Sequence, residues 1–125
     1  MLGNIDAAAN LAVKDLTAAR NFYEGTLGLA QVDAEGDELI VYRSGKTKLN
    51  VYTSREAGTN KATAVTWAVG DQVEDVVRAL KAKGVAFEHY DMPDTTLQGD
   101  IHVAGDMKVA WFKDPDGNIL NIVNR

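Results

Sequence analysis

Residues 111–124 read WFKDPDGNILNIVN, and the DPDG tetrad at 114–117 has strong turn chemistry. Asp can hydrogen-bond its own backbone at the first turn position, Pro presets φ at the second, and Gly tolerates a positive φ at the fourth. Residues 107–112, rich in apolar and aromatic side chains, precede the turn, and the mostly aliphatic residues 119–123 follow it. Two strand-like runs joined by a turn predict a closing β-hairpin.

Upstream of this hairpin, one pattern of residues occurs twice in the chain at an offset of 56 residues. Val13, Asp15, Gly28 and Ala30 of the first copy match Val69, Asp71, Gly84 and Ala86 of the second. Each copy predicts a strand, an N-capped helix that ends at Gly, and further strands that end in a hairpin. We therefore expect one α+β domain of two tandem βαβββ modules, residues 4–54 and 62–125, joined by a polar linker at 55–61.

The first module begins with a predicted strand at residues 5–13. Asp15 is a good N-cap for the following helix, in which apolar residues recur at near-helical spacing. A short strand is expected at 31–33. Residues 37–43 and 47–53 predict a hairpin.

The second module begins with a predicted strand at residues 62–69. Asp71 is the expected N-cap of an amphipathic helix, with Glu74 at the capping-box position. Gly84 ends this helix, and residues 85–90 resume as a strand.

Alternation along the two first strands separates bulky from small side chains, because successive residues of a strand point to opposite faces. One face carries Ala9, Leu11 and Val13 in the first module, and Val65, Trp67 and Val69 in the second. The other carries Ala8, Asn10 and Ala12, and Ala62, Ala64, Thr66 and Ala68. The bulky faces suit packing under a helix. The small faces predict either room for a ligand or a close approach of two sheets or subunits, and the two are compatible.

Composition excludes several classes of function. The chain has 125 residues, no cysteine and a net charge of −5. Thiol chemistry and thiolate metal sites are thereby excluded, and the charge argues against nucleic acid as a partner. Neither a signal peptide nor an apolar run long enough to span a membrane is evident, so a cytoplasmic protein without a membrane partner is expected.

Three stretches resemble the vicinal oxygen chelate superfamily, of the glyoxalase, bleomycin resistance protein and dioxygenase type. They are Val-x-Asp at 13–15, NFYEGTLGL at 21–29 and WFKDPDGNILNIV at 111–123. The resemblance implies that the paired modules form a cupped mixed β-sheet and that the protein is a homodimer. It also implies one divalent metal in the enzymes, held by His, Gln or Glu side chains. These motifs belong to the scaffold and do not name a reaction.

The four positions at which the resemblance implies metal ligands are Ala8, Asn50, Ala64 and Asn121. Alanine has no donor atom, and an Asn carbonyl oxygen is a weak neutral ligand. A catalytic metal typically needs about three good protein ligands. We therefore expect no metal and no other cofactor here.

The two histidines, His89 and His102, lie in the stretch 88–106, which contains five Asp and Glu residues and no Lys or Arg. This stretch predicts either an acidic lid with His102 as a general base or a solvated loop with incidental histidines. Trp111 and Tyr52 are candidates for stacking on a planar ligand, whereas Trp67 is expected in the core.

These observations favour metal-independent binding of an organic ligand, planar or cationic, in the sheet cleft, as in drug-sequestering members of the superfamily. The expected ligand-binding residues are Asn10, Asn50, Tyr52, Thr66, His102, Trp111 and Asn121. The alternative is a glyoxalase-like lyase or isomerase, or a dioxygenase, with a non-standard or absent metal site. A structural or regulatory protein without a pocket is the third hypothesis.

Overall fold

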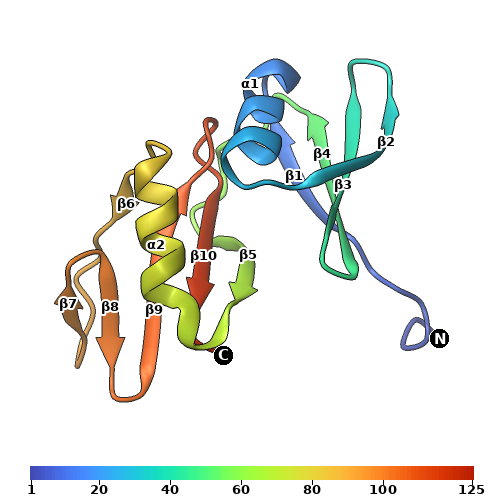
Figure 1. Cartoon of the computed structure of the whole chain (residues 1–125). Coiled ribbons are helices and arrows are strands. Elements are labelled where there is room, and N and C mark those ends of the chain that lie inside the picture. Colours follow the sequence, from blue (N-terminus) through green and yellow to red (C-terminus); the bar gives the residue numbers. More distant parts are fainter. The chain divides into compact units, whose positions relative to one another are not determined.

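The chain divides into two units, Met1–Thr59 and Asn60–Arg125, in the computed structural model, which describes all 125 residues. Each unit carries a mixed β-sheet and its own helix, so the predicted α+β class is confirmed (Figure 1). None of the helices has the length and apolar character that a membrane span requires.

Unit 1 follows the predicted order of elements. It contains β1 (Ala9–Val13), α1 (Leu16–Arg20), a π-helical turn (Asn21–Thr26), β2 (Ala30–Glu35), β3 (Leu39–Ser44) and β4 (Thr47–Thr53). The sheet order is β1-β4-β3-β2, with β1 parallel to β4 and the other pairs antiparallel. The first and last strands of the βαβββ module are therefore neighbours.

The start of unit 1 confirms the cap and shortens the first strand. The side chain of Asp15 accepts a hydrogen bond from the backbone N–H of Thr17 at 2.8 Å. The strand predicted at 5–13 begins only at Ala9, which pairs with Leu49. Ala7 and Ala8 have low strand propensity and lie outside the ladder. The short strand predicted at 31–33 is longer, because β2 pairs with β3 over Ala30–Glu35.

Unit 2 repeats the arrangement with additional strands. It contains β5 (Thr63–Ala68), a 3₁₀ turn (Gly70–Gln72), α2 (Val73–Ala82), β6 (Phe87–Glu88), β7 (Thr96–Gln98), β8 (Ile101–Ala104), β9 (Met107–Lys113) and β10 (Ile119–Val123). The order is β5-β10-β9-β8-β7, with β6 also paired to β9. Again the first and last strands of the module, β5 and β10, are parallel neighbours.

The closing hairpin of β9 and β10 forms as predicted from its turn. The buried Asp114 carboxylate accepts bonds from the backbone N–H of Asp116 at 3.0 Å and of Asn118 at 2.8 Å. Its second oxygen accepts from the Asn118 side chain at 2.7 Å. Gly117 has φ +93°, a conformation that suits glycine. The DPDG chemistry therefore sets the register that pairs Asn121 with Trp111.

The predicted capping box of the second helix is wrong. Gly70, with φ +62°, leads the chain into a 3₁₀ turn that contains Asp71. As a result α2 begins at Val73, after Gln72, and no side chain caps it. The left-handed Gly70 and the 3₁₀ turn that it begins thus move the start of α2 past Asp71.

The acidic stretch 88–106 is more ordered than a lid or a solvated loop. Of the strand predicted at 85–90, only Phe87–Glu88 pair with β9, and the β7–β8 hairpin follows. Asp100 bonds Lys81 of α2 at 2.7 Å. Lys81 of the helix thus supplies a positive charge that the stretch itself lacks.

The core of unit 2 lies between the sheet and α2, which crosses one sheet face (Figure 1). Its buried side chains include Val73, Val77, Phe112, Leu120 and Ile122. Trp67 is half-buried and pairs with Ile122, so it shares this face as predicted. In each unit, the sheet face that is turned away from the helix is called the distal face below.

Candidate functional site

The distal face of unit 2 brings together four of the predicted ligand-binding residues. Asn121 lies opposite Trp111 on β9 and Thr66 on β5, so their side chains point to the same side of the sheet. His102 on β8 joins them, with its ring centroid 4.9 Å from that of Trp111. The ladder places these residues side by side, although they are far apart in sequence.

Trp111 is the central aromatic side chain of this face. Its indole Nε1–H donates to the hydroxyl of Thr63 at 3.0 Å. Tyr90 packs edge-on against it, with ring centroids 5.3 Å apart. The His102 ring meets it at an interplanar angle of 84°. The half-buried indole is therefore a platform with aromatic neighbours, which suits contact with a flat ligand.

His102 is buried, with 2% of its surface exposed. Its Nε2 accepts a hydrogen bond from the backbone N–H of Tyr90 at 2.9 Å. In the neutral ring the proton must then lie on Nδ1. This Nδ1 is buried and has no hydrogen-bond partner. Because the ring's one free lone pair is already used, His102 is arranged as a hydrogen-bond donor.

Asn121 is the second buried group without a partner. It is 7% exposed, and its Oδ1 accepts no hydrogen bond. Buried polar groups are nearly always paired, and leaving one unpaired costs about 1–3 kcal/mol. The distal face of unit 2 therefore holds a donor and an acceptor that both lack partners.

A pocket of about 290 Å³ adjoins this face. It is lined by His89, Tyr90, Asp91, Met92, Thr95, Leu97 and His102. His89 Nε2 lies 2.7 Å from an Asp100 oxygen. The hydrogen bond from Lys81, reinforced by the one from His89, holds the pKa of the Asp100 carboxyl below its usual value. This ion pair ties the pocket wall to α2.

The distal face of unit 1 carries the other three predicted residues. Asn50 donates through Nδ2 to Asn10 Oδ1 at 3.3 Å, and the two residues are partners in the parallel ladder. Tyr52, two residues further along β4, is 38% exposed. Asn10 and Asn50 correspond in register to Thr66 and Asn121 of unit 2, the first-strand members being 56 residues apart. The predicted equivalence of the two last-strand asparagines is thus confirmed by the ladders.

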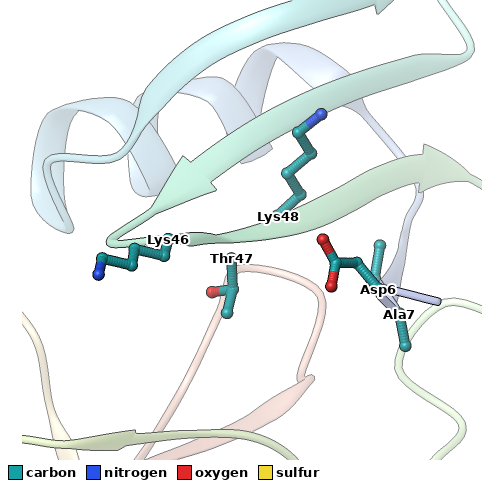
Figure 2. Close-up of a pocket in the computed structure, with 6 residues that line it drawn as sticks. Asp6, Ala7, Lys46, Thr47 and Lys48 are labelled. Atoms are coloured by element: carbon teal, nitrogen blue, oxygen red, sulfur yellow. The ribbon is translucent and has the colours of Figure 1, made fainter. Parts of the chain in front are cut away.

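A second pocket, of about 480 Å³, lies at Ala8 in unit 1. Figure 2 shows the Asp6 carboxylate directed toward β4, while the ammonium groups of Lys46 and Lys48 point away in different directions. The cations therefore do not converge on one point. The pocket is lined by one carboxylate, one hydroxyl and two lysines, a set without the convergent ligands of a metal or anion site.

The metal implied by the resemblance does not fit the residues at its four positions. Ala8 and Ala64 offer no donor atom, and Asn50 is engaged with Asn10. The amide oxygens of Asn50 and Asn121 are the only ligand atoms that remain, where about three good ligands are typical. Within neither unit do three or more His, Cys, Asp or Glu side chains gather to hold a metal ion.

Two contacts of the site were not predicted from the sequence. Tyr90 supplies both an aromatic wall and the N–H that selects the His102 tautomer. Thr63 receives the Trp111 indole N–H. Thr63 lies beside an irregular register between β5 and β10, and no local pattern marks such a shift. A cleft that combines residues of both modules stays a prediction.

The family comparison and the solved structures indicate the same fold for this chain. Residues 4–122 match the model of the Glyoxalase/Bleomycin resistance protein/Dioxygenase superfamily. No curated protein sequence matches the chain.

Solved structures share the fold at low sequence identity. An integron cassette protein from the mobile metagenome of the Halifax Harbour sewage outfall is 16% identical, with a TM-score of 0.72 over 98% of this chain and 99% of that one. Lactoylglutathione lyase from Agrobacterium tumefaciens is 17% identical, with a TM-score of 0.72 over 96% and 92%. A mutant of the fosfomycin resistance protein FosX from Listeria monocytogenes, solved with Mn(II) and 1S,2S-dihydroxypropylphosphonic acid, is 14% identical, with a TM-score of 0.72 over 99% and 91%.

Proposed function

The chain belongs to the Glyoxalase/Bleomycin resistance protein/Dioxygenase superfamily, and we propose that it captures a small organic ligand on its distal sheet faces without a metal. The observation that carries this proposal is the pair of buried groups without partners, His102 Nδ1 and Asn121 Oδ1, beside Trp111. Native proteins seldom leave such groups unpaired unless a ligand or a water completes them.

The chemistry of the donors supports metal independence. A neutral amide oxygen and alanines at the ligand positions cannot replace the imidazoles and carboxylates that hold divalent ions in catalytic sites. Elemental analysis of the purified protein tests this directly, and we expect less than one divalent ion per ten chains. One tightly bound Ni, Zn, Mn or Fe per chain, whose removal by a chelator abolishes ligand binding, contradicts the proposal.

The ligand is planar or cationic. Trp111 and Tyr52 offer aromatic surface, and the net charge of −5 favours a positively charged molecule. The superfamily's drug-sequestering members of the bleomycin-resistance type provide the analogy for capture without turnover. A cytoplasmic homodimer is part of the same proposal.

A thermal-shift screen of planar and cationic compounds in the presence of a chelator tests ligand capture. A ligand that binds only the folded protein at 100 times its Kd stabilises it by about 2.7 kcal/mol. This gain produces a clear rise in Tm for hits. A screen in which compounds bind only after a metal is added argues for the enzymatic alternative.

That alternative is a lyase, isomerase or dioxygenase with a non-standard or absent metal site. The position of His102 in the lining of a pocket favours it, since an imidazole there lies within reach of a bound molecule. However, Nε2 is already bonded to the Tyr90 N–H, which leaves no lone pair for a general base. If His102→Ala abolishes a turnover that the wild type shows, catalysis by His102 is established, whereas equal activity dismisses it.

A further inference from the structure

The two buried groups without partners both adjoin one aromatic side chain, the indole of Trp111. His102 is on β8, Trp111 on β9 and Asn121 on β10, and these strands are consecutive in the sheet. Neighbouring strands are about 4.8 Å apart. His102 pairs with Val109, two residues along β9 from Trp111, so the donor and the acceptor are separated by about two strand spacings across the sheet and by two residues along it. A flat ring system with a hydrogen bond at each end, reached by the two side chains, spans such a distance.

The indole of Trp111 reaches across the strand that carries Asn121. Its Nε1–H bonds Thr63 on β5, and β10 lies between β9 and β5. Asn121 is directly opposite Trp111 in the ladder, so the indole crosses β10 at this residue. This crossing accounts for the burial of a polar side chain on a sheet face that has no helix over it.

The indole is held in place by one hydrogen bond and two aromatic contacts. Its one hydrogen bond, to the Thr63 hydroxyl, is exposed to solvent, and such neutral bonds contribute little net stability. Aromatic contacts with His102 and Tyr90 supply the rest. Rotation of the Trp111 side chain therefore breaks one exposed hydrogen bond and two ring contacts, and it uncovers Asn121 and one face of His102.

The exposed pair of atoms then specifies the ligand. His102 Nδ1–H requires an acceptor, and Asn121 Oδ1 requires a donor. The vacated space has the shape of an indole, which is a flat bicyclic ring system. The pocket of about 290 Å³ that shares His102 gives room for a substituent beyond the ring.

We propose that the distal face of unit 2 binds a flat bicyclic lactam or vinylogous amide in the place that the Trp111 indole vacates. The ligand's carbonyl oxygen accepts from His102 Nδ1–H, and its N–H on the opposite edge donates to Asn121 Oδ1. The proposal rests on the proposed capture of organic ligands and names the chemistry of the ligand. On this face it makes Trp111 the side chain that the ligand displaces, in place of the stacking platform described above.

The test uses two probes that differ in one hydrogen-bond donor. 4-Quinolone carries a carbonyl and an N–H on opposite edges of one ring, and N-methyl-4-quinolone lacks the N–H. Calorimetric titration of the full-length protein is expected to show about tenfold weaker binding of the N-methyl compound, since one hydrogen bond is lost. The indole N–H resonance of Trp111 is expected to shift on binding as its bond to Thr63 breaks.

Variants assign the effect to individual residues. Asn121→Leu is expected to abolish the preference for 4-quinolone over its N-methyl derivative, because the acceptor is gone. Trp111→Ala is expected to bind 4-quinolone several-fold more tightly, because no side chain has to be displaced. Gln98→Leu is the matched control, because it also replaces a side-chain amide by leucine, at an exposed position of β7. It is expected to keep the preference.

Three results overturn the inference: equal affinity of the wild type for the two probes, a preference that persists in Asn121→Leu, or no binding of 4-quinolone to Trp111→Ala. The wider proposal of ligand capture is judged separately. If the thermal-shift screen yields hits that lack this donor–acceptor pattern, ligand capture stands and the lactam inference fails. If the screen yields no metal-free ligand at all, both fail.

Discussion

Two asparagines in the closing hairpin offer a direct test of whether the unpartnered group is a functional feature. Asn118 and Asn121 are buried to the same extent, with 6% and 7% exposed. The Asn118 side chain bonds the Asp114 carboxylate at 2.7 Å, whereas Asn121 Oδ1 has no partner. The same substitution by leucine, which has the branched shape of asparagine but a larger volume, should therefore have opposite effects at the two positions.

The expected magnitudes follow from these contacts. Asn121→Leu removes an unpaired acceptor that costs about 1–3 kcal/mol. Part of this gain is lost to imperfect packing of the branched side chain, which typically costs less than about 1.5 kcal/mol. We expect the free energy of unfolding to rise by about 1 kcal/mol. Asn118→Leu removes a hydrogen bond to a buried charged group, so stability should fall by about 1.5–3 kcal/mol.

Urea denaturation followed by far-UV circular dichroism measures both changes. The midpoint shift multiplied by the m-value gives the difference in stability, provided that m is unchanged. A gain in Asn121→Leu together with lost ligand binding would show that stability is sacrificed for function at this position. A loss of more than 1 kcal/mol in Asn121→Leu, similar to that in Asn118→Leu, would refute the reasoning from the unpaired oxygen.

Three further predictions follow from individual contacts. The Lys81 hydrogen bond lowers the pKa of Asp100, so this pair stabilises the fold at neutral pH. Its contribution is lost as pH falls through the lowered pKa, below about 4. Asp100→Asn should therefore flatten the dependence of Tm on pH in that range. Burial raises the pKa of Tyr42 well above its usual value, so stability should decrease above about pH 10, and Tyr42→Phe should reduce this decrease in alkaline unfolding experiments. The ¹⁵N shifts of His102 should report a proton on Nδ1; a proton on Nε2 contradicts the bond from the Tyr90 N–H.

Much of the fold was predictable because its signals are local. The DPDG turn places Asp114 where its carboxylate accepts from the next residues of the chain. The repeat at an offset of 56 residues correctly anticipated the equivalence of the first strands, and the family resemblance that of Asn50 and Asn121 on the last strands. Strand alternation correctly placed Leu11 and Val13 in the core. In each case the residues that interact are close in sequence or repeat a pattern.

The errors arose where a local backbone conformation or a distant segment overrides the sequence pattern. The left-handed Gly70 displaced the expected cap at Asp71. The β7–β8 hairpin forms in a stretch whose charges suggested a loop, because Lys81 of α2 neutralises Asp100 and β9 offers an edge for pairing. Charge patterns along a sequence do not show which opposite charges approach from other elements.

By itself, the sequence determined the α+β class, the repeated βαβββ module, the closing hairpin and the alanines and asparagines at the implied metal positions. The tertiary structure alone decided the chemical state of the site. His102 becomes a buried donor because the Tyr90 N–H takes its Nε2, and Asn121 is left without a partner beneath the indole of Trp111. Hydrogen-bond satisfaction depends on which atoms from separate strands meet, and that information exists only once the sheet is assembled.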